Sequence, residues 1–278
     1  MARPRPNRAG KGPGPHSIAM VGTIVFFHAH PDDECIITGG TMAELSDQGH
    51  RVVLVTATGG ELGEIHCQLE EGEELGQRRA REVAEAARVL GAARHEFLGY
   101  RDSGMAGTPA NQAAGSFWQA DIEEAALRLA GLLAEEQPEA LTVYDEHGIY
   151  GHPDHVQVHR VGMRAGELTG VPRLLMATQS RSHLRSLLTR AREQGMAIED
   201  GLDVDTFGVP EERITTAIDV SPYLDRKRAA MRAHASQIPS DSIFLSMPDE
   251  VFAAAFGSEW YILSGARPER PPRTSLLD

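Results

Sequence analysis

The stretch GTIVFFHAHPDDE, residues 22–34, joins an apolar segment directly to a run of ionisable side chains. The β-branched and aromatic residues of its first half predict a buried strand over residues 22–30. Two histidines and three carboxylates then follow within seven residues: His28, His30, Asp32, Asp33 and Glu34. Unpaired polar groups at the mouth of an apolar element are costly, so something must compensate them. A bound cation is the first candidate.

Strand-like and helix-like segments alternate after this stretch. Further strands are expected at residues 51–60, 94–100, 140–146 and 173–179, and helices at 34–49, 75–91, 118–137, 152–170 and 182–195. Repeated strand–helix units predict a mainly parallel sheet with right-handed crossovers. We therefore predict an α/β, Rossmann-like fold with helices on both faces of the sheet. A less regular C-terminal part follows, with a strand at 213–220, a helix at 223–237 and a helix–strand pair at 249–263.

The length of 278 residues suits one large α/β domain with a small addition. We expect a disordered basic tail at 1–17, a Rossmann-like core at 18–195, a cap completing the pocket at 196–265 and a loose tail at 266–278. The opening segment is rich in Pro and Gly and lacks the apolar core of a signal peptide.

Composition narrows the class of protein. A net charge of −13 argues against a nucleic-acid partner, because a phosphate backbone would be repelled. The sequence has no apolar run near the roughly 18 residues that a membrane span needs. Only two cysteines are present, Cys35 and Cys67, so a disulfide framework is not expected and a reducing cytoplasm is the predicted location.

A second polar cluster, DEHGIYGHPDH at residues 145–155, follows the strand predicted at 140–146. In open α/β sheets ligands bind beyond the carboxyl ends of strands, so both clusters are expected at the same edge. His152 and His155 are spaced i, i+3 and share one side of a starting helix. Imidazole nitrogen with carboxylate oxygen is typical of zinc sites, and a catalytic zinc keeps one position open for water. Either cluster alone would read as helix capping, but the two together favour a metal site.

These residues also resemble a known family. AHPDDE (29–34) and GHPDH (151–155), with TATGGELGE (56–64), RRAREVAEAARVLG (78–91), YRDSGM (100–105) and TVYDEHGIYGHPDH (142–155), are similar to motifs of the PIG-L (LmbE-like) zinc-dependent N-deacetylases. That family includes the N-acetylglucosaminyl-inositol deacetylase and the conjugate amidase of mycothiol metabolism. The resemblance covers roughly Val21 to Gly170.

The resemblance implies a role for each matching residue of the metal site. It makes His30, Asp33 and His155 the metal ligands and Asp32 the general base. The residues themselves leave open which of the two aspartates does which. Zn²⁺ is the implied ion, with Fe²⁺ a second candidate because nitrogen and oxygen ligands do not discriminate sharply between the two.

The resemblance further implies that His152 protonates the leaving amine or steadies the oxyanion, and that Tyr150 helps to polarise the carbonyl. Asp154 is placed to orient an imidazole. Arg79 matches a substrate-binding arginine, and Asp102 is expected to hold sugar hydroxyls.

Several other residues are expected to have lesser roles. His159 rivals His155 in spacing but is interpreted as structural, His28 as buried packing and His147 as a pocket residue. Cys35 is expected to pack as a small hydrophobe, and Cys67 to be exposed in the acidic loop at 61–74, which we interpret as a solvated flap. The TGGELG segment does not fit the dinucleotide-binding fingerprint.

The predicted function is that of a zinc-dependent hydrolase which removes the N-acetyl group from a small molecule containing N-acetylglucosamine, such as N-acetylglucosaminyl-inositol. One alternative is an amidase acting on mycothiol-type conjugates or another N-acyl sugar. Another is a metal- or sugar-binding module without catalysis, although such a module has no need of an unligated carboxylate such as Asp32. The expected partner is the small N-acetylated amino sugar, and the sequence is compatible with a homo-oligomer.

Overall fold

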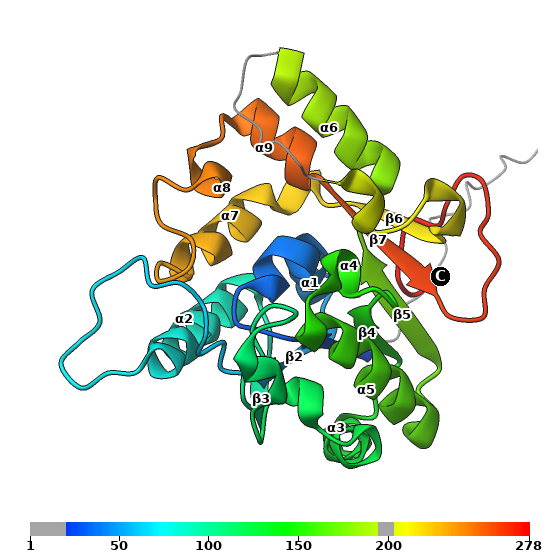
Figure 1. Ribbon diagram of the computed structural model, residues 1–278. Helices are drawn as coiled ribbons and strands as arrows, with labels where there is room; N and C mark the ends of the chain where they lie inside the picture. Colours follow the sequence, from blue (N-terminus) through cyan, green and yellow to red (C-terminus); the bar gives the residue numbers. More distant parts are fainter. Residues whose placement is uncertain (1–20, 194–202) are drawn as a thin grey trace, which may run out of the picture.

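The strand predicted at residues 22–30 is β1 (Thr23–His28), and it lies near the centre of one seven-stranded sheet. The computed structural model describes residues 21–193 and 203–278 (Figure 1). The sheet order is β3-β2-β1-β4-β5-β7-β6. The other strands are β2 (Arg51–Thr58), β3 (Arg94–Tyr100), β4 (Ala140–Tyr144), β5 (Arg173–Thr178), β6 (Thr216–Asp219) and β7 (Ser258–Leu263). The tail expected at 1–17 and the boundary expected at 195/196 lie outside the described residues.

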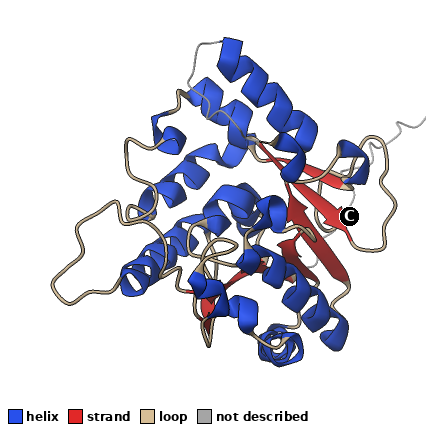
Figure 2. Cartoon of the chain, viewed as in Figure 1, coloured by secondary structure: helices blue, strands red, loops and turns tan. Residues whose placement is uncertain are grey.

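Helices alternate with the strands, as Figure 2 shows. They are α1 (Gly39–Asp47), α2 (Leu75–Leu90), α3 (Ile122–Glu136), α4 (Gly148–Gly151), α5 (Pro153–Thr169), α6 (Arg181–Glu193), α7 (Leu224–Ala233), α8 (Ile243–Ser246) and α9 (Asp249–Phe256). Short turns complete the chain: the π-helical η1 (Glu34–Thr38) and the 3₁₀ segments η2 (Pro109–Gln112), η3 (Phe117–Gln119), η4 (Val204–Thr206), η5 (Glu211–Arg213) and η6 (Ser221–Tyr223). The predicted strands and helices are confirmed, except that the helix expected at 34–49 is divided between η1 and α1.

The two halves of the sheet place their helices on opposite faces. Strands β1 to β5 are parallel, and the sheet order reverses between β1 and β4. Right-handed crossovers that run in opposite directions along a sheet put their helices on opposite sides. Accordingly α1, α2 and α7 pack with one another, whereas α3 packs with α5. The predicted α/β, Rossmann-like fold is confirmed.

The local sequence explains why individual elements begin and end where they do. Helix α2 starts with a capping box in which Glu74 and Gln77 satisfy each other's backbone N–H groups. It ends at Gly91, whose φ of 82° suits a residue without a side chain. Strands β1, β2 and β4 are buried almost throughout, as expected for a parallel sheet covered on both faces.

The C-terminal part of the chain extends the same sheet. Strand β7 pairs antiparallel with β5, and β6 pairs antiparallel with β7. Helix α7 packs against α2 and α1, so the C-terminal part also contacts the N-terminal half. The division into core and cap stays a prediction. Across the described ranges, none of the helices has the length and apolar character required to cross a bilayer.

Candidate active site

The two polar clusters meet where the sheet order reverses. The first cluster follows β1 and the second follows β4, and these strands are hydrogen-bonded neighbours. At such a switch point the loops diverge to opposite faces and leave a crevice at the carboxyl edge. The sequence therefore brings together residues that lie about 120 positions apart.

Asp33 lies between two of the predicted metal-binding imidazoles. Its Oδ2 is 3.4 Å from His30 Nδ1, and its Oδ1 is 3.3 Å from His155 Nε2. Two atoms that each lie about 2.0–2.1 Å from a tetrahedral zinc are about 3.3–3.4 Å apart. Burial would raise the pKa of the Asp33 carboxyl, but the charge and hydrogen bond of His155 and the hydrogen bond of His30 outweigh it, so this pKa lies well below its ordinary value.

The other nitrogen of His30 is held by carboxylates. Its Nε2 lies 3.1 Å from Asp154 Oδ2 and 3.7 Å from Asp102 Oδ1. Asp154 Oδ2 also accepts a 2.9 Å hydrogen bond from the Ser103 backbone N–H. Burial alone would lower the pKa of His30, yet hydrogen bonds to Asp154 and Asp33 raise it to about 10. The surroundings of His30 therefore strongly favour positive charge, whether a proton or a metal ion supplies it.

The donor set fits a divalent metal. His30, His152 and His155 are buried and each offers a ring nitrogen within 4.8 Å of the others. His155 Nδ1 makes no hydrogen bond to any described residue. Imidazole nitrogen together with carboxylate oxygen is the donor chemistry that zinc and iron accept. His152 therefore lies within ligand distance of the same ion as His30 and His155.

Asp32 adopts a strained backbone. Its φ is 119°, a region that residues with a side chain rarely occupy. Its Oδ2 forms an ion pair of 3.2 Å with Arg79 Nη2. Burial raises the pKa of the Asp32 carboxyl to about 6, while the charge of Arg79 opposes this rise. A carboxylate with a pKa near neutrality, placed beside residues that fit a divalent metal, is suited to proton transfer.

The strained Asp32 is held from several directions. Its backbone N–H donates to Glu34 Oε2 at 2.9 Å, and Glu34 Oε1 lies 2.6 Å from His234 Nε2. Both side chains of the Glu34–His234 pair are fully buried. Cys35 Sγ donates to the Asp32 carbonyl at 2.9 Å. The sequence alone indicated no role for Glu34 or His234.

The guanidinium of Arg79 is held by contacts within the fold, next to Asp32. Its guanidinium donates to the backbone carbonyls of Pro31 and Gly60, in addition to the ion pair with Asp32. The residue is only 3% exposed. These contacts support a role in positioning Asp32, and the predicted contact of Arg79 with substrate stays a prediction.

A second strained residue precedes Tyr150. Ile149 has a φ of 66°, and Asp145 Oδ1 accepts hydrogen bonds of 3.0 Å from the backbone N–H groups of His147 and Ile149. Asp145 Oδ2 accepts a bond of 2.5 Å from the Thr178 hydroxyl. These bonds place the Tyr150 hydroxyl 3.4 Å from His155 Nε2. Asp145 belongs to the second polar cluster, but the sequence alone indicated no role for it in holding this turn.

His152 is the N-cap of α5. Its Nδ1 accepts a hydrogen bond of 3.1 Å from the Asp154 backbone N–H, so the proton of the neutral ring is on Nε2. Burial, followed by the charges of His30 and His155, lowers the pKa of His152 to about 4. The ring therefore offers an N–H donor at the site near neutral pH.

Asp102, His28 and His159 are all held by hydrogen bonds within the fold. Asp102 is 8% exposed, and its Oδ1 accepts a 2.8 Å bond from Gly104 N–H. His28 is buried between the hydroxyls of Tyr144 and Thr38, and His159 Nδ1 lies 2.9 Å from the Tyr144 carbonyl, which supports structural roles for both.

The other two predicted pocket and loop residues lie nearer the surface. The side chain of His147 is 63% exposed and borders an open hollow beside Tyr150. Cys67 is half-buried, not exposed as predicted, because it lies beside the Arg78 side chain.

The acidic loop is partly neutralised by α2. Glu73 pairs with Arg78 at 2.7 Å and with Arg81. Glu61 is exposed, yet its carboxylate accepts a 3.0 Å hydrogen bond from the Asp102 backbone N–H. The loop therefore contributes a fixed contact to the Asp102 segment.

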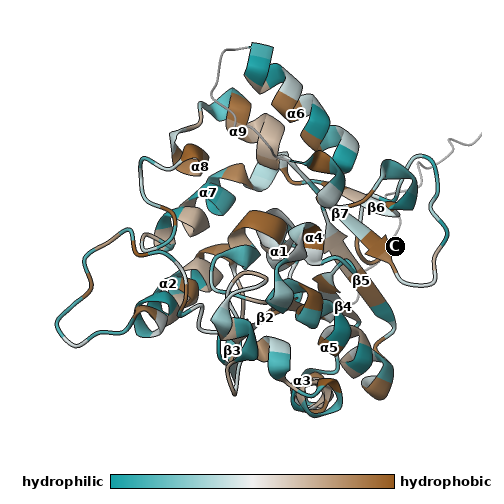
Figure 3. Ribbon diagram, in the orientation of Figure 1, coloured by the Kyte–Doolittle hydropathy of each residue, from teal (hydrophilic) through white to brown (hydrophobic). Residues whose placement is uncertain are grey.

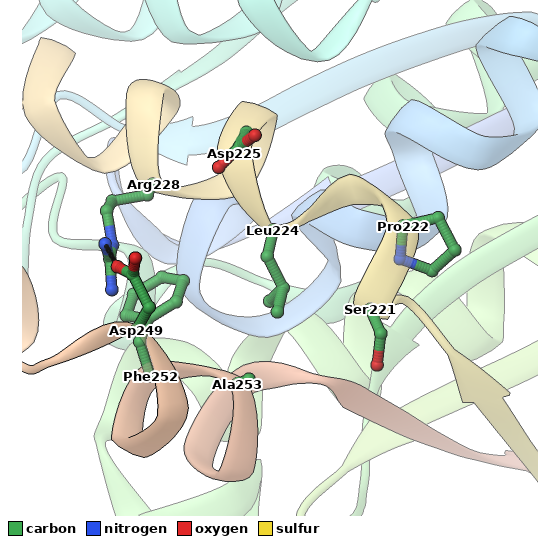
Figure 4. Close-up of a pocket in the computed structure, with 8 residues that line it drawn as sticks. All are labelled: Ser221, Pro222, Leu224, Asp225, Arg228, Asp249, Phe252 and Ala253. Atoms are coloured by element: carbon green, nitrogen blue, oxygen red, sulfur yellow. Dashed lines mark hydrogen bonds and ion pairs between the residues drawn. The ribbon is translucent and has the colours of Figure 1, made fainter.

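A separate hollow of about 250 Å³ lies between α7 and α9 (Figure 4). Its main polar groups already satisfy each other, since Arg228 pairs with Asp249 at 2.5 Å and stacks 4.0 Å over Phe252. The residues of the candidate active site are not part of its lining. We therefore place the chemistry at the β1/β4 crevice.

Comparisons with known proteins agree with this placement. The family model described as GlcNAc-PI de-N-acetylase (PIG-L) matches residues 25–166, which include both clusters. A protein of Acidothermus cellulolyticus named 1D-myo-inositol 2-acetamido-2-deoxy-alpha-D-glucopyranoside deacetylase is 45% identical over 261 residues, covering 88% of this chain and 89% of the relative. A protein of the same name from Thermomonospora curvata is 40% identical, covering 88% and 91%.

Solved structures share the fold. N,N'-diacetylchitobiose deacetylase from Pyrococcus horikoshii superposes with a TM-score of 0.56 at 23% identity, covering 88% of this chain and 84% of that one. A zinc-inhibited form of the teicoplanin deacetylase Orf2 superposes with a TM-score of 0.55 at 16% identity, covering 87% and 99%.

Proposed function

Because the chain belongs to the PIG-L family of de-N-acetylases, it is an enzyme that removes acetyl groups from amides, and we propose that its substrate is an N-acetylglucosaminide with a neutral aglycone such as inositol. Relatives of 38–45% identity that cover most of the chain carry the name of a deacetylase for such a compound. The observation that carries the catalytic proposal is Asp32, a half-buried carboxylate held beside the candidate metal-binding residues at a φ of 119°.

We propose His30, Asp33 and His155 as the ligands of one divalent metal, Zn²⁺ or Fe²⁺. The distances of 3.3 and 3.4 Å from Asp33 to the two imidazoles support this set. When bound, such an ion polarises the amide carbonyl and lowers the pKa of a water molecule. The carboxylates around His30 Nε2 fix the ring so that Nδ1 faces Asp33.

Asp32 then acts as the general base. Arg79 and the Glu34–His234 pair hold its side chain and backbone, so the carboxylate needs little reorganisation before it accepts a proton. In the overall reaction water adds to the acyl carbon, the C–N bond breaks, and the nitrogen leaves as an amine after gaining a proton.

His152 and Tyr150 supply the donors on the opposite side. The Nε2–H of neutral His152 would stabilise the oxyanion, and the proton that Asp32 accepts from water is passed on to the departing nitrogen. The Tyr150 hydroxyl lies near His155, within reach of a carbonyl at the metal site. Asp154 orients His30, because its Oδ2 is fixed by Ser103.

The sugar is assigned to the side of Asp102. Carboxylates accept hydrogen bonds from hydroxyl pairs, and the net charge of −13 disfavours phosphorylated or carboxylated ligands. The core at 18–195 would supply the catalytic residues, and the part at 196–265 would close the pocket. Cys35 and Cys67 are free thiols, which supports a cytoplasmic location.

The function is tested by comparing kcat/KM for N-acetylglucosaminyl-inositol, an N-acetylglucosamine phosphate and an N-acetyl amino acid at one salt concentration. We expect the neutral glycoside to be turned over fastest, with acetate and free amine released in equal amounts. Asp32→Asn protein is the control for contaminating hydrolases. A clear preference for the charged substrates would contradict the assignment.

A further inference from the structure

His28 and Tyr144 are the last residues of β1 and β4, the two strands that lead into the candidate metal site. The backbones of these strands pair over residues 24–26 and 140–142, so the pairing ends two residues before each strand does. Beyond it a side-chain contact joins the strand ends, since the Tyr144 hydroxyl lies 2.7 Å from His28 Nδ1. The same hydroxyl accepts a 3.3 Å hydrogen bond from the Ala29 N–H. These contacts hold the strand ends together at the mouth of the crevice.

The contact between His28 and Tyr144 belongs to a row of buried polar side chains. His28 Nε2 lies 2.9 Å from the Thr38 hydroxyl, which is 3.4 Å from the Glu34 carbonyl. His28, Thr38 and Tyr144 are all fully buried. Their surroundings are apolar, since β4 reads ALTVY and the neighbouring β5 is largely hydrophobic, as Figure 3 shows. Because an unpaired polar group is costly in such surroundings, each member of the row depends on its neighbours.

Tyr144 reaches both clusters of the candidate metal site. Its ring stacks on the His155 imidazole, with the ring centroids 4.5 Å apart and the planes inclined by 25°. Its hydroxyl binds the Ala29 N–H, which directly precedes His30. Its backbone carbonyl lies 2.9 Å from Nδ1 of His159, one turn beyond His155 on α5. One tyrosine therefore links a proposed ligand of the first cluster to a proposed ligand of the second.

His155 lacks the support that a metal-binding histidine usually has. Such a ring commonly donates its second N–H to a carboxylate, a carbonyl or water, and this bond fixes its orientation. His30 has this support from Asp154, whereas His155 Nδ1 makes no hydrogen bond to any described residue. The His155 ring instead contacts two aromatic rings, those of Tyr144 and Tyr150, the latter at 4.8 Å and 67°. Tyr150 is 38% exposed and Tyr144 is fully buried, so Tyr144 is the better fixed of the two.

We propose that Tyr144 is a positioning residue of the metal site, which sets the orientation of the His155 ring by stacking and is itself held by its hydroxyl contacts with His28 and the Ala29 N–H. This inference rests on the proposed function, because His155 is one of the metal ligands proposed there. Tyr144 offers no ligand atom and takes no part in proton transfer. It acts by restricting the orientations of His155 before the ion binds, which reduces the entropy lost on binding.

The test measures the Kd of the full chain for Zn²⁺ by competition with a chromophoric chelator. Tyr144→Phe keeps the ring but removes the hydroxyl, so His28 Nδ1 and the Ala29 N–H lose their partner. Loss of a group that orients a metal ligand typically weakens metal binding by about 10- to 100-fold. We expect the Kd to rise by about tenfold in Tyr144→Phe, and by about 100-fold in Tyr144→Leu, which also removes the stacked ring.

Tyr261→Phe is the matched control. Tyr261 is also fully buried, and its hydroxyl donates to Thr41 Oγ1 at 2.9 Å, away from the proposed metal ligands. Both Tyr→Phe variants should unfold at a lower urea concentration than the wild type, but only Tyr144→Phe should bind Zn²⁺ more weakly.

The Co²⁺-loaded proteins give a second readout, because their visible absorption reports the coordination geometry. The spectrum should shift in Tyr144→Phe and stay as in the wild type in Tyr261→Phe. Thr38→Val removes the hydroxyl beside His28 Nε2 and should raise the Zn²⁺ Kd less than Tyr144→Phe does, and Thr38→Ser should restore it. In the double variant the two effects should not add, because both changes break the same row of contacts.

Each outcome decides the proposal. If the wild type binds Zn²⁺ and Tyr144→Phe keeps both its Kd and its Co²⁺ spectrum, the positioning role is overturned while the proposed metal ligands and the deacetylase function stand. If Tyr144→Phe and Tyr261→Phe weaken Zn²⁺ binding equally, the effect is a general loss of stability, and the role of Tyr144 is overturned as well. If the wild type binds neither Zn²⁺ nor Co²⁺, the proposed metal site is wrong and this inference falls with it.

Discussion

The two edges of the parallel sheet carry charged clusters of opposite character. At the amino edge, Arg51 and Arg94 begin β2 and β3 and pair with Glu136 at the end of α3, at 2.7 and 2.9 Å. At the carboxyl edge, Asp33 is buried beside His30 and His155, and the half-buried Asp32 pairs with Arg79 at a φ of 119°.

The pKa values of Glu136, at the amino edge, and Asp32, at the carboxyl edge, are shifted in opposite directions. The hydrogen bond from Arg51 is the largest cause of the low pKa of Glu136, about 2; burial opposes it, and the hydrogen bond from Arg94 lowers the pKa further. For Asp32 burial is the largest cause and raises the pKa to about 6. Charges that match each other near solvent stabilise the fold modestly. At the carboxyl edge, by contrast, the carboxylates outnumber the positively charged side chains near them. Such an excess of negative charge favours the binding of a further cation.

The largest effect is expected from Asp32. Asp32→Asn should lower kcat by about two to four orders of magnitude, because it removes the general base. The variant should keep its metal, since Asp32 pairs with Arg79 and is not placed between the imidazoles. Kinetics and metal analysis of the same preparation check both statements. Loss of metal would mean that Asp32 and Asp33 have each other's roles.

A smaller effect is expected from the pair that supports Asp32. His234→Ala leaves the buried Glu34 carboxylate unpaired, which should lower the free energy of unfolding by about 3 kcal/mol. It should also lower kcat about tenfold, because the Glu34 bond to the Asp32 N–H loses its support. His234→Gln should restore part of both, since an amide N–H can donate to Glu34.

The matched control comes from the amino edge. His50 is half-buried and its Nδ1 accepts a 3.2 Å bond from the Gly22 N–H. His50→Ala should leave kcat unchanged. If His50→Ala and His234→Ala reduce kcat equally, the two edges do not differ in the way described.

The smallest effect is expected from Glu136→Gln, which should lower the free energy of unfolding by about 1 kcal/mol at pH 7 and leave kcat unchanged. The folded pKa of about 2 is below the ordinary value of 4.5, so the contribution is complete above pH 4.5 and is lost as the pH falls toward 2. Urea unfolding at pH 7, 5 and 4 measures the difference between the two proteins. A difference that grows as the pH falls would contradict this sign.

The features that could be predicted from the sequence are those that depend on local patterns of residues. Strands β1, β2, β4 and β5 are short and mainly apolar runs, and each of the two polar clusters is contiguous, so these features could be identified without the structure. The Glu34–His234 contact joins residues 200 positions apart, and His234 lies in a segment that reads as an ordinary helix. The φ of Asp32 has no signal in its residue type.

An apolar cavity of about 480 Å³ beside Asp32 could not be predicted for a related reason. Leu184 and Leu187 are spaced as on any amphipathic helix, and that pattern predicts packing against a core. Only the tertiary arrangement shows that these side chains border a cavity next to Asp32.

We propose that the carboxyl edge of the sheet binds one divalent metal through His30, Asp33 and His155. Metal content per chain, measured for the wild type, His155→Ala, His152→Ala and Asp32→Asn, tests it most directly. We expect about one ion per chain in the wild type, in His152→Ala and in Asp32→Asn, and a collapse of occupancy in His155→Ala. Full metal retention by His155→Ala, or an equal loss in His152→Ala, would contradict it.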